Sequence, residues 1–341
     1  MDITVIGLAG CGKSSLLAAL SGQSARGVQI VTIKVPDKRV DRLAELYQPK
    51  KTTHAEIRAR EAAWPGAEAS KRRSEFEQYV EKIKGAGLFI HVVRTCQTPT
   101  AVEAADVLRD LNKLDSEMVF ADLLICERLI ERDNKHPMEL VQRLAVHKAK
   151  EMLEVEKPLW SGQWDDNEAG ALAGLNFVTL TPQMLVLNTE EGLAPEDLPT
   201  IPDDKLHGRH VVPVCLEVAA EVAAMPAEDQ QAFAEEMGLG EPAVHLIARE
   251  AFSQLNLISF FTVGDQDVRA WPIPAGMIAA KAAGRIHTDI ERGFIRGEVV
   301  PYETLIELGS LKACREAGKL RLEGKTYVLV DGEIMHVRFN V

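Results

Sequence analysis

The chain opens with a short apolar stretch that runs directly into a glycine-rich turn and then into a helical stretch. The turn reads GLAGCGKSS from Gly7 to Ser15 and matches the pattern G-x-x-x-x-G-K-[ST]. Residues 3–7 have the character of a buried strand, and residues 16–20 that of a helix. Glycines in such a turn let backbone N–H groups surround phosphate oxygens at the positive end of the helix. The order of strand, turn and helix therefore predicts a phosphate-binding loop, with an ordinary glycine-rich turn as the alternative.

The motif assigns a task to each polar group of the loop. We expect Lys13 to reach the β- and γ-phosphates as the catalytic residue, and the Ser14 hydroxyl to bind Mg²⁺. Cys11 is either a small residue that fills space or a thiol whose pKa is lowered by the helix N-terminus, so that its oxidation would block phosphate entry. The predicted nucleotide contacts in the loop are Gly10, Cys11, Gly12, Lys13, Ser14 and Ser15.

Further apolar runs of strand length, separated by helical segments, occur at 28–35, 87–93, 184–187 and 210–214. This alternation is typical of a parallel sheet with helices on both faces, so the sequence predicts an α/β fold. Between 111 and 160, apolar residues recur at helical spacing on both sides of a break at 133–137, and the first half has the spacing of a coiled-coil seam at Leu111, Leu114, Met118, Ala121 and Ile125. Two helices of about twenty residues, each roughly 30 Å long, are expected to form an antiparallel hairpin there.

The C-terminal part changes to strand-like runs at 258–263, 267–271, 325–330 and 335–339, with one or two helices around 302–317. This pattern favours a small mixed α+β domain. We therefore expect a phosphate-loop domain in two parts, 1–108 and 164–255, a helical insertion at 109–163, and a C-terminal domain at 256–341.

Charge and composition exclude several classes of protein. With a formal net charge of -12, the chain is unlike a protein that coats nucleic acid, and we expect no DNA partner. The basic cluster Lys71, Arg72 and Arg73 either meets phosphate locally or forms a solvated face. No apolar run approaches the ~20 residues of a membrane span, and the start lacks the basic region of a signal peptide. The 5 cysteines are scattered without a C-x-x-C pair, as in reduced cytoplasmic proteins, so we expect a cytoplasmic protein without a membrane partner.

Several blocks resemble the Obg-like ATPase family, the YchF-type P-loop proteins of the translation-factor group. Besides the loop, they are VPDKR at 35–39, PKKT at 49–52, HVVR at 91–94, GRIHTD at 284–289 and RFNV at 338–341. Together the blocks span nearly the whole chain. The resemblance implies a P-loop NTPase domain interrupted by the helical hairpin, a C-terminal β-grasp (TGS) domain, a nucleotide with Mg²⁺, and the ribosome as partner.

The resemblance also bears on the choice of base. The family favours ATP and carries N-x-x-E where other translation GTPases carry N-K-x-D. Asn188 and Glu191 fit that pattern directly after the strand 184–187, although a polar turn at the strand end is the alternative. Cys215 and Leu216 occupy the place of the family's base-contacting S-A-K loop, with Cys215 where Ser is expected.

One departure from the family concerns hydrolysis. In the D-x-x-G segment, Glu61 replaces Asp and Trp64 replaces Gly. Glu61 is the candidate to support Mg²⁺ through a water molecule. Two functions follow: a slow NTP-hydrolysing switch that prefers ATP to GTP, or a nucleotide-binding scaffold with little or no hydrolysis. Either would dock to the ribosome or ribosomal RNA through the basic cluster and the TGS residues Arg285, His287, Arg292 and Arg296.

Overall fold

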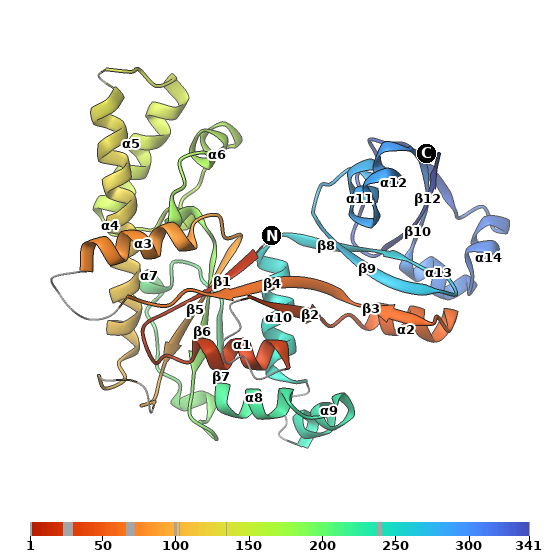
Figure 1. Ribbon diagram of the computed structural model, residues 1–341, viewed down its shortest axis with the longest axis horizontal. Coiled ribbons are helices and arrows are strands. Elements are labelled where there is room, and N and C mark those ends of the chain that lie inside the picture. Colours follow the sequence, from red (N-terminus) through yellow and green to blue (C-terminus); the bar gives the residue numbers. More distant parts are fainter. Residues whose placement is uncertain are drawn as a thin grey trace. The chain divides into compact units, whose positions relative to one another are not determined.

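A computed structural model describes residues 2–22, 30–65, 72–98, 101, 103–133, 135–236 and 241–340. The chain divides into two compact units (Figure 1). Unit 1 comprises Met1–Thr32 and Arg58–Ile247, and unit 2 comprises Ile33–Ile57 and Ala248–Val341. Within the described ranges, no helix is both long enough and apolar enough to cross a membrane.

Unit 1 is built on a six-stranded sheet with the strand order β2-β4-β1-β5-β6-β7. β1 pairs in parallel with β4 and β5, and β6 pairs in parallel with β5 and β7. Every residue of β5 is buried, as expected of a central strand that is covered on both faces. The predicted α/β architecture is thereby confirmed. The strands are β1 (Asp2–Ile6), β2 (Ile30–Val35), β4 (Ala55–Glu61), β5 (Leu88–Arg94), β6 (Gln183–Asn188) and β7 (Val211–Val214).

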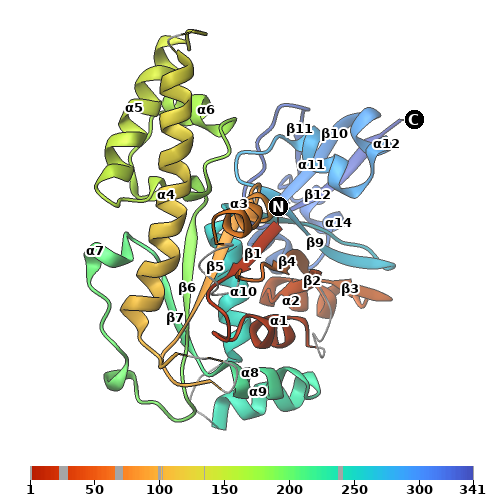
Figure 2. The same cartoon turned by 60° about the vertical axis from the view of Figure 1, so that its left-hand side comes forward.

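Helices cover both faces of this sheet (Figures 1 and 2). α1 (Lys13–Ser21) packs against α8 (Leu216–Ala223) on one face. On the other face, α3 (Arg72–Ile83) and α4 (Val107–Asp133) bury their apolar residues against Ile6 of β1 and Phe89 of β5. The other helical elements of unit 1 are η1 (Leu159–Ser161), α6 (Asp166–Ala173), η2 (Val178–Leu180), η3 (Pro195–Asp197), α7 (Asp203–Leu206) and α9 (Ala227–Glu236), and α10 (Ala243–Gln254) spans the division between the units.

The helical hairpin consists of α4, with 27 residues, and α5 (Leu140–Glu154), with 15 residues. The sequence predicted two helices of similar length with Leu114 and Met118 in their seam. These two side chains instead face the sheet of unit 1, and the hairpin core is formed by residues such as Val119, Cys126 and Val146. The apolar stripe of α4 therefore has two successive partners, the sheet and then α5, and helical periodicity cannot distinguish them.

Unit 2 contains a mixed six-stranded sheet with the order β11-β10-β12-β8-β9-β3. Its apolar core includes Phe260, Phe294 and Met335. The strand predicted at 325–330 is wrong: this segment begins with a turn at 325–326, is otherwise irregular, and meets Ile278 through a single bridge at Val328. The strands are β3 (Lys51–Thr53), β8 (Leu257–Thr262), β9 (Asp267–Pro274), β10 (Phe294–Pro301), β11 (Arg321–Glu323) and β12 (Glu333–Phe339), and the helices are α2 (Lys38–Tyr47), α11 (Ala279–Ile286), α12 (Thr288–Arg292), α13 (Tyr302–Leu308) and α14 (Leu311–Glu316).

The segment 33–57 groups with unit 2, although the sequence placed it in the P-loop domain. β3 pairs in parallel with β9, and Thr52 lies opposite Val268. Arg39 of α2 donates a 2.7 Å hydrogen bond to the Asp331 carboxylate. A three-residue strand gives no sequence signal for its partner, so this placement follows from tertiary contacts. The domain limits expected at 108, 163 and 255 stay a prediction.

Candidate functional site

The phosphate-binding loop connects the end of β1 to the start of α1 at the carboxyl edge of the unit 1 sheet. Gly7, Gly10 and Gly12 have φ values of 144°, 74° and 107°, which L side chains rarely adopt. A Cβ atom on Gly12 would lie 2.6 Å from Asn188 Nδ2, and one on Gly7 would lie 2.5 Å from the Val92 carbonyl oxygen. The loop therefore needs glycine at these two positions for space as well as for backbone conformation.

The loop places positive charge at the start of α1. Among the described residues, no side chain caps this helix, and the first N–H groups of a helix have no acceptor within it. Lys13 is 5% exposed, and its Nζ donates to the carbonyl oxygens of Gly7 at 3.1 Å and Leu8 at 2.9 Å. The ammonium group thus lies inside the loop at the N-terminus of α1, an arrangement suited to a phosphate.

Ser14 and Glu61 meet beside the loop. Glu61 is the last residue of β4 and lies opposite Val5 of β1, one residue before β1 ends. The Ser14 hydroxyl donates a 2.8 Å hydrogen bond to Glu61 Oε2. A hydroxyl and a carboxylate are hard oxygen donors of the kind that Mg²⁺ binds. Within the described residues there is no cluster of three or more His, Cys, Asp or Glu that could hold a metal.

Asn188 connects the loop to the segment after β7. Its Nδ2 donates to the Cys11 carbonyl oxygen at 3.1 Å, and its Oδ1 accepts from the backbone N–H of Leu216 at 3.2 Å. Cys215, which precedes Leu216, is half-buried, and Glu191 lies exposed in the turn after β6. The structure therefore brings Asn188 and Leu216 to the loop, whereas the base contacts of Asn188, Glu191, Cys215 and Leu216 stay a prediction.

Cys11 is buried in the loop, with 2% of its surface exposed. Burial raises the pKa of its thiol, and the charge of Lys13 opposes this rise only in part. The expectation of a lowered pKa is therefore wrong, because removal from water outweighs the helix N-terminus. A buried, protonated thiol reacts slowly with oxidants, and its position favours a role in filling space.

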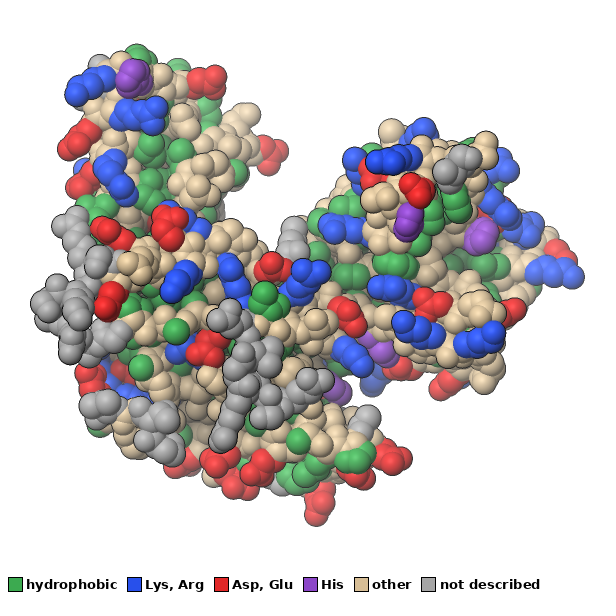
Figure 3. All heavy atoms as spheres, viewed as in Figure 1, with side chains coloured by type: hydrophobic (Ala, Val, Ile, Leu, Met, Phe, Trp, Pro, Cys, Tyr) green, Lys and Arg blue, Asp and Glu red, His purple; other side chains and the backbone are tan. Residues whose placement is uncertain are grey.

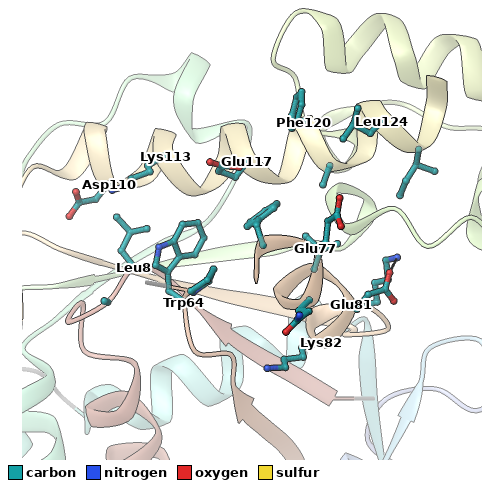
Figure 4. Close-up of a pocket in the computed structure, with 18 of the residues that line it drawn as sticks. Leu8, Trp64, Glu77, Glu81, Lys82, Asp110, Lys113, Glu117, Phe120 and Leu124 are labelled. Atoms are coloured by element: carbon teal, nitrogen blue, oxygen red, sulfur yellow. Dashed lines mark hydrogen bonds and ion pairs between the residues drawn. The ribbon is translucent and has the colours of Figure 1, made fainter. Parts of the chain in front are cut away.

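Trp64 replaces the glycine of the family's D-x-x-G segment and belongs to an aromatic cluster. Its ring lies edge-on to Phe76 and Tyr79 of α3, with centroid distances of 5.9 and 5.4 Å. Trp64 also lines a cavity of about 1170 Å³ between α3 and α4, whose lining includes the loop residues Leu8 and Ala9 (Figure 4). An anchored indole at this place differs from a small glycine whose N–H can follow the γ-phosphate.

The candidate basic residues lie partly outside the described residues and partly in unit 2. Lys71 lies outside the described residues, and so do the side chains of Arg72 and Arg73, although both belong to α3. Arg285, His287, Arg292 and Arg296 all lie in unit 2, and the side chain of Arg292 is 83% exposed.

Comparison with known proteins shows the family to which the chain belongs. The chain is 36% identical to a protein of Haemophilus influenzae named "Ribosome-binding ATPase YchF", over 99% of this chain and 98% of that protein. Proteins of the same name from Pasteurella multocida and Bacillus subtilis are 34% and 31% identical with the same coverage. The chain belongs to the YchF family. A family model, YchF-GTPase_C, described as "Protein of unknown function (DUF933)", matches residues 257–340.

A solved YchF structure shares the fold. The Schizosaccharomyces pombe YchF GTPase superposes with a TM-score of 0.87, covering 99% of this chain and 97% of that one at 24% identity. At this identity the likeness concerns the fold alone.

One contact of the phosphate-binding loop was not predicted from the sequence. The hydroxyl of Thr98 donates a 2.6 Å hydrogen bond to the Gly10 carbonyl oxygen across 88 positions of the chain. A threonine in a loop carries no sequence signal for such a contact, so only the tertiary structure reveals it.

Proposed function

We propose that this chain binds ATP with Mg²⁺ at the phosphate-binding loop and hydrolyses it slowly while it works at the ribosome in the cytoplasm. The observation that carries the proposal is the buried Lys13 ammonium inside the loop, with the Ser14 and Glu61 oxygens beside it. Relatives at 31–36% identity carry the name "Ribosome-binding ATPase YchF", which supports both the reaction and the partner.

The phosphates would be held by the loop itself. Lys13 would leave the carbonyl oxygens of Gly7 and Leu8 and bind phosphate oxygens, while the first N–H groups of α1 donate to the same tail. Ser14 would be a direct ligand of Mg²⁺, and Glu61 would hold one of its water molecules. A bound Mg²⁺ would neutralise charge on the phosphate tail. Because phosphoryl transfer depends mainly on positioning and electrostatics, these residues account for binding and for part of catalysis.

The preference for ATP over GTP would come from the end of β6. A glutamate at position 191 replaces the aspartate that pairs with guanine in N-K-x-D proteins, and Asn188 is hydrogen-bonded to the Cys11 carbonyl oxygen of the loop. Calorimetry with non-hydrolysable ATP and GTP analogues tests this preference, and equal dissociation constants would contradict it.

Docking to the ribosome would involve basic side chains of unit 2. Figure 3 shows Lys and Arg side chains over much of the visible face of this unit, with Asp and Glu among them. Phosphate contacts from such side chains weaken as salt rises. We expect Arg292→Glu with Arg296→Glu to reduce pelleting with ribosomes at low salt, and unchanged pelleting would exclude this surface.

A second function, a scaffold that binds nucleotide with little or no turnover, is favoured by the anchored Trp64. One experiment separates the two. Phosphate release and ATP binding are measured for the wild type, for Lys13→Ala and for Lys312→Ala, whose side chain is 84% exposed in unit 2 and which serves as the control. If phosphate release is lost only in Lys13→Ala, the result supports the ATPase. If the wild type binds ATP but releases phosphate no faster than Lys13→Ala does, the result supports the scaffold. A wild type that binds neither ATP nor GTP would contradict both.

A further inference from the structure

Two consecutive carbonyl groups of the phosphate-binding loop accept hydrogen bonds from side chains outside the loop. Thr98 Oγ donates to the Gly10 oxygen at 2.6 Å, and Asn188 Nδ2 donates to the Cys11 oxygen at 3.1 Å. Thr98 lies in the segment that follows β5, and Asn188 ends β6, the strand that pairs with β5. β6 and the segment that follows its neighbour β5 therefore each supply one donor to the loop.

These donors belong to one hydrogen-bonded frame. The backbone N–H of Thr95 donates to the Asn188 carbonyl oxygen at 2.9 Å, and the Thr95 hydroxyl donates to the same oxygen at 3.2 Å. Asn188 is only 8% exposed, and its Oδ1 is occupied by the Leu216 N–H. The segment that carries Thr98 is thus tied to the backbone of Asn188, so the two donors keep their spacing.

The frame determines where two loop N–H groups point. In a planar trans peptide the C=O and N–H bonds have opposite directions. Holding the Gly10 oxygen toward Thr98 therefore turns the Cys11 N–H away from Thr98. Holding the Cys11 oxygen toward Asn188 likewise turns the Gly12 N–H away from Asn188.

The Leu8 carbonyl oxygen lies on the side of the loop toward which the Lys13 ammonium group points. This oxygen accepts the Lys13 ammonium at 2.9 Å and a long 3.4 Å hydrogen bond from the Cys11 N–H. The Cys11 N–H thus points to the same place as the lysine that would meet the phosphates. A phosphate oxygen there would be a stronger, charged acceptor than the distant carbonyl group.

We propose that Thr98 is a positioning residue for the nucleotide: together with Asn188 it holds consecutive loop carbonyl groups outward so that the Cys11 and Gly12 N–H groups face the triphosphate. This inference rests on the proposed function, since it concerns how the loop grips a phosphate tail. It predicts that the Thr98 hydroxyl, 88 positions from its acceptor, contributes to nucleotide affinity without touching the nucleotide.

The test uses three variants of the full chain. Thr98→Val removes the hydroxyl and keeps the shape, Thr98→Ser retains the hydroxyl, and Thr326→Val changes an exposed threonine of unit 2 as the control. Affinity for a non-hydrolysable ATP analogue with Mg²⁺, and for inorganic tripolyphosphate, is measured by calorimetry. We expect Thr98→Val to weaken both ligands roughly tenfold, because the Gly10 carbonyl group is no longer held outward and the Cys11 N–H no longer faces the phosphates.

The same variants separate positioning from a loss of fold. Thr98→Ser should bind like the wild type, and Thr98→Val should keep the wild-type urea midpoint while KM for ATP rises more than kcat falls. Wild-type affinity in Thr98→Val, or equal weakening in Thr98→Ser and Thr98→Val, would overturn this proposal and leave the proposed function intact. A wild type without affinity for either ligand would overturn both.

Discussion

The hydroxyl of Ser14 donates a hydrogen bond of 2.8 Å to the carboxylate of Glu61, which lies 47 positions further along the chain. A carboxylate at the end of β4 thereby reaches the residue that follows the loop lysine. The extra methylene of glutamate, compared with the aspartate of the family motif, does not prevent the contact. We therefore expect this pair to be the part of the altered segment that supports a metal ion.

Removal of the Glu61 charge should affect the metal more than the fold. We expect Glu61→Gln to raise the Mg²⁺ concentration for half-maximal ATP binding about tenfold, because groups that orient metal ligands typically contribute that much. Glu56→Gln, at an exposed position of the same strand, is the matched control and should leave the Mg²⁺ titration unchanged. Superimposable titrations for Glu61→Gln and the wild type would show that this carboxylate does not serve the metal.

Truncation of Trp64 should destabilise the packing of α3. The ring is half-buried and lies edge-on to both Phe76 and Tyr79, so Trp64→Ala is expected to lower the free energy of unfolding by about 2 kcal/mol. Trp64→Phe keeps an aromatic ring and should cost less. A double-mutant cycle with Phe76→Leu, followed by urea unfolding, should give a coupling energy of about 1 kcal/mol. Additive effects would show that the two rings pack independently.

The buried carboxylate of Asp122 predicts a pH-dependent stability. It accepts hydrogen bonds from the Val178 N–H, the Thr179 N–H and the Thr179 hydroxyl. Burial raises its pKa from 3.8 to about 6, and the bonds from Thr179 and Val178 oppose the rise only in part. The folded protein therefore binds more protons than the unfolded chain between about pH 4 and pH 6, so this group's contribution to stability falls as pH rises through that window.

Urea unfolding from pH 4 to pH 7 measures this contribution as the difference between the wild type and Asp122→Asn. The free energy of unfolding of the wild type relative to Asp122→Asn should fall by up to about 3 kcal/mol as the pH rises from about 4 to about 6. Glu131→Gln, at an exposed position of the same helix, is the control. Parallel curves for the wild type and Asp122→Asn would contradict the raised pKa.

Arg39 should contribute more to unit 2 than an ordinary surface arginine. Its guanidinium pairs with Asp37 and Asp331 and lies 5.1 Å from the centre of the Phe261 ring. We expect Arg39→Ala to destabilise the attachment of α2 by about 2 kcal/mol, and Arg39→Lys to recover only part because an ammonium cannot reproduce the planar contacts. Hydrogen exchange of α2 should become about tenfold faster or more in Arg39→Ala.

The matched control for Arg39 is Arg42→Ala on the same helix. The Arg42 and Glu45 side chains are 61% and 63% exposed, and such pairs contribute less than 1 kcal/mol. Equal exchange rates in the two variants would show that the Arg39 contacts do not hold α2.

The local sequence pattern was sufficient to predict those features that depend on residues close together in the chain. The glycines, Lys13 and Ser14 of the loop lie within nine positions, so spacing alone predicted the loop, and buried apolar runs predicted the parallel sheet around it. Glu61 was also predicted to support the metal, but on family position and not on any local signal. The apolar stripe of α4 was recognised as helical, yet its division between the sheet and α5 was not, because both partners require the same periodicity.

Only the tertiary structure decided which distant residues meet. The hydrogen bonds from Thr98 to Gly10 and from Asn188 to Cys11 span 88 and 177 positions, and the placement of 33–57 in unit 2 depends on pairing between β3 and β9. The raised pKa of Cys11 likewise reflects burial by surrounding elements, which outweighs its place at a helix N-terminus. The physical reason is common to all three: short-range propensity acts between chain neighbours, whereas contacts and burial arise only when separate segments pack against one another.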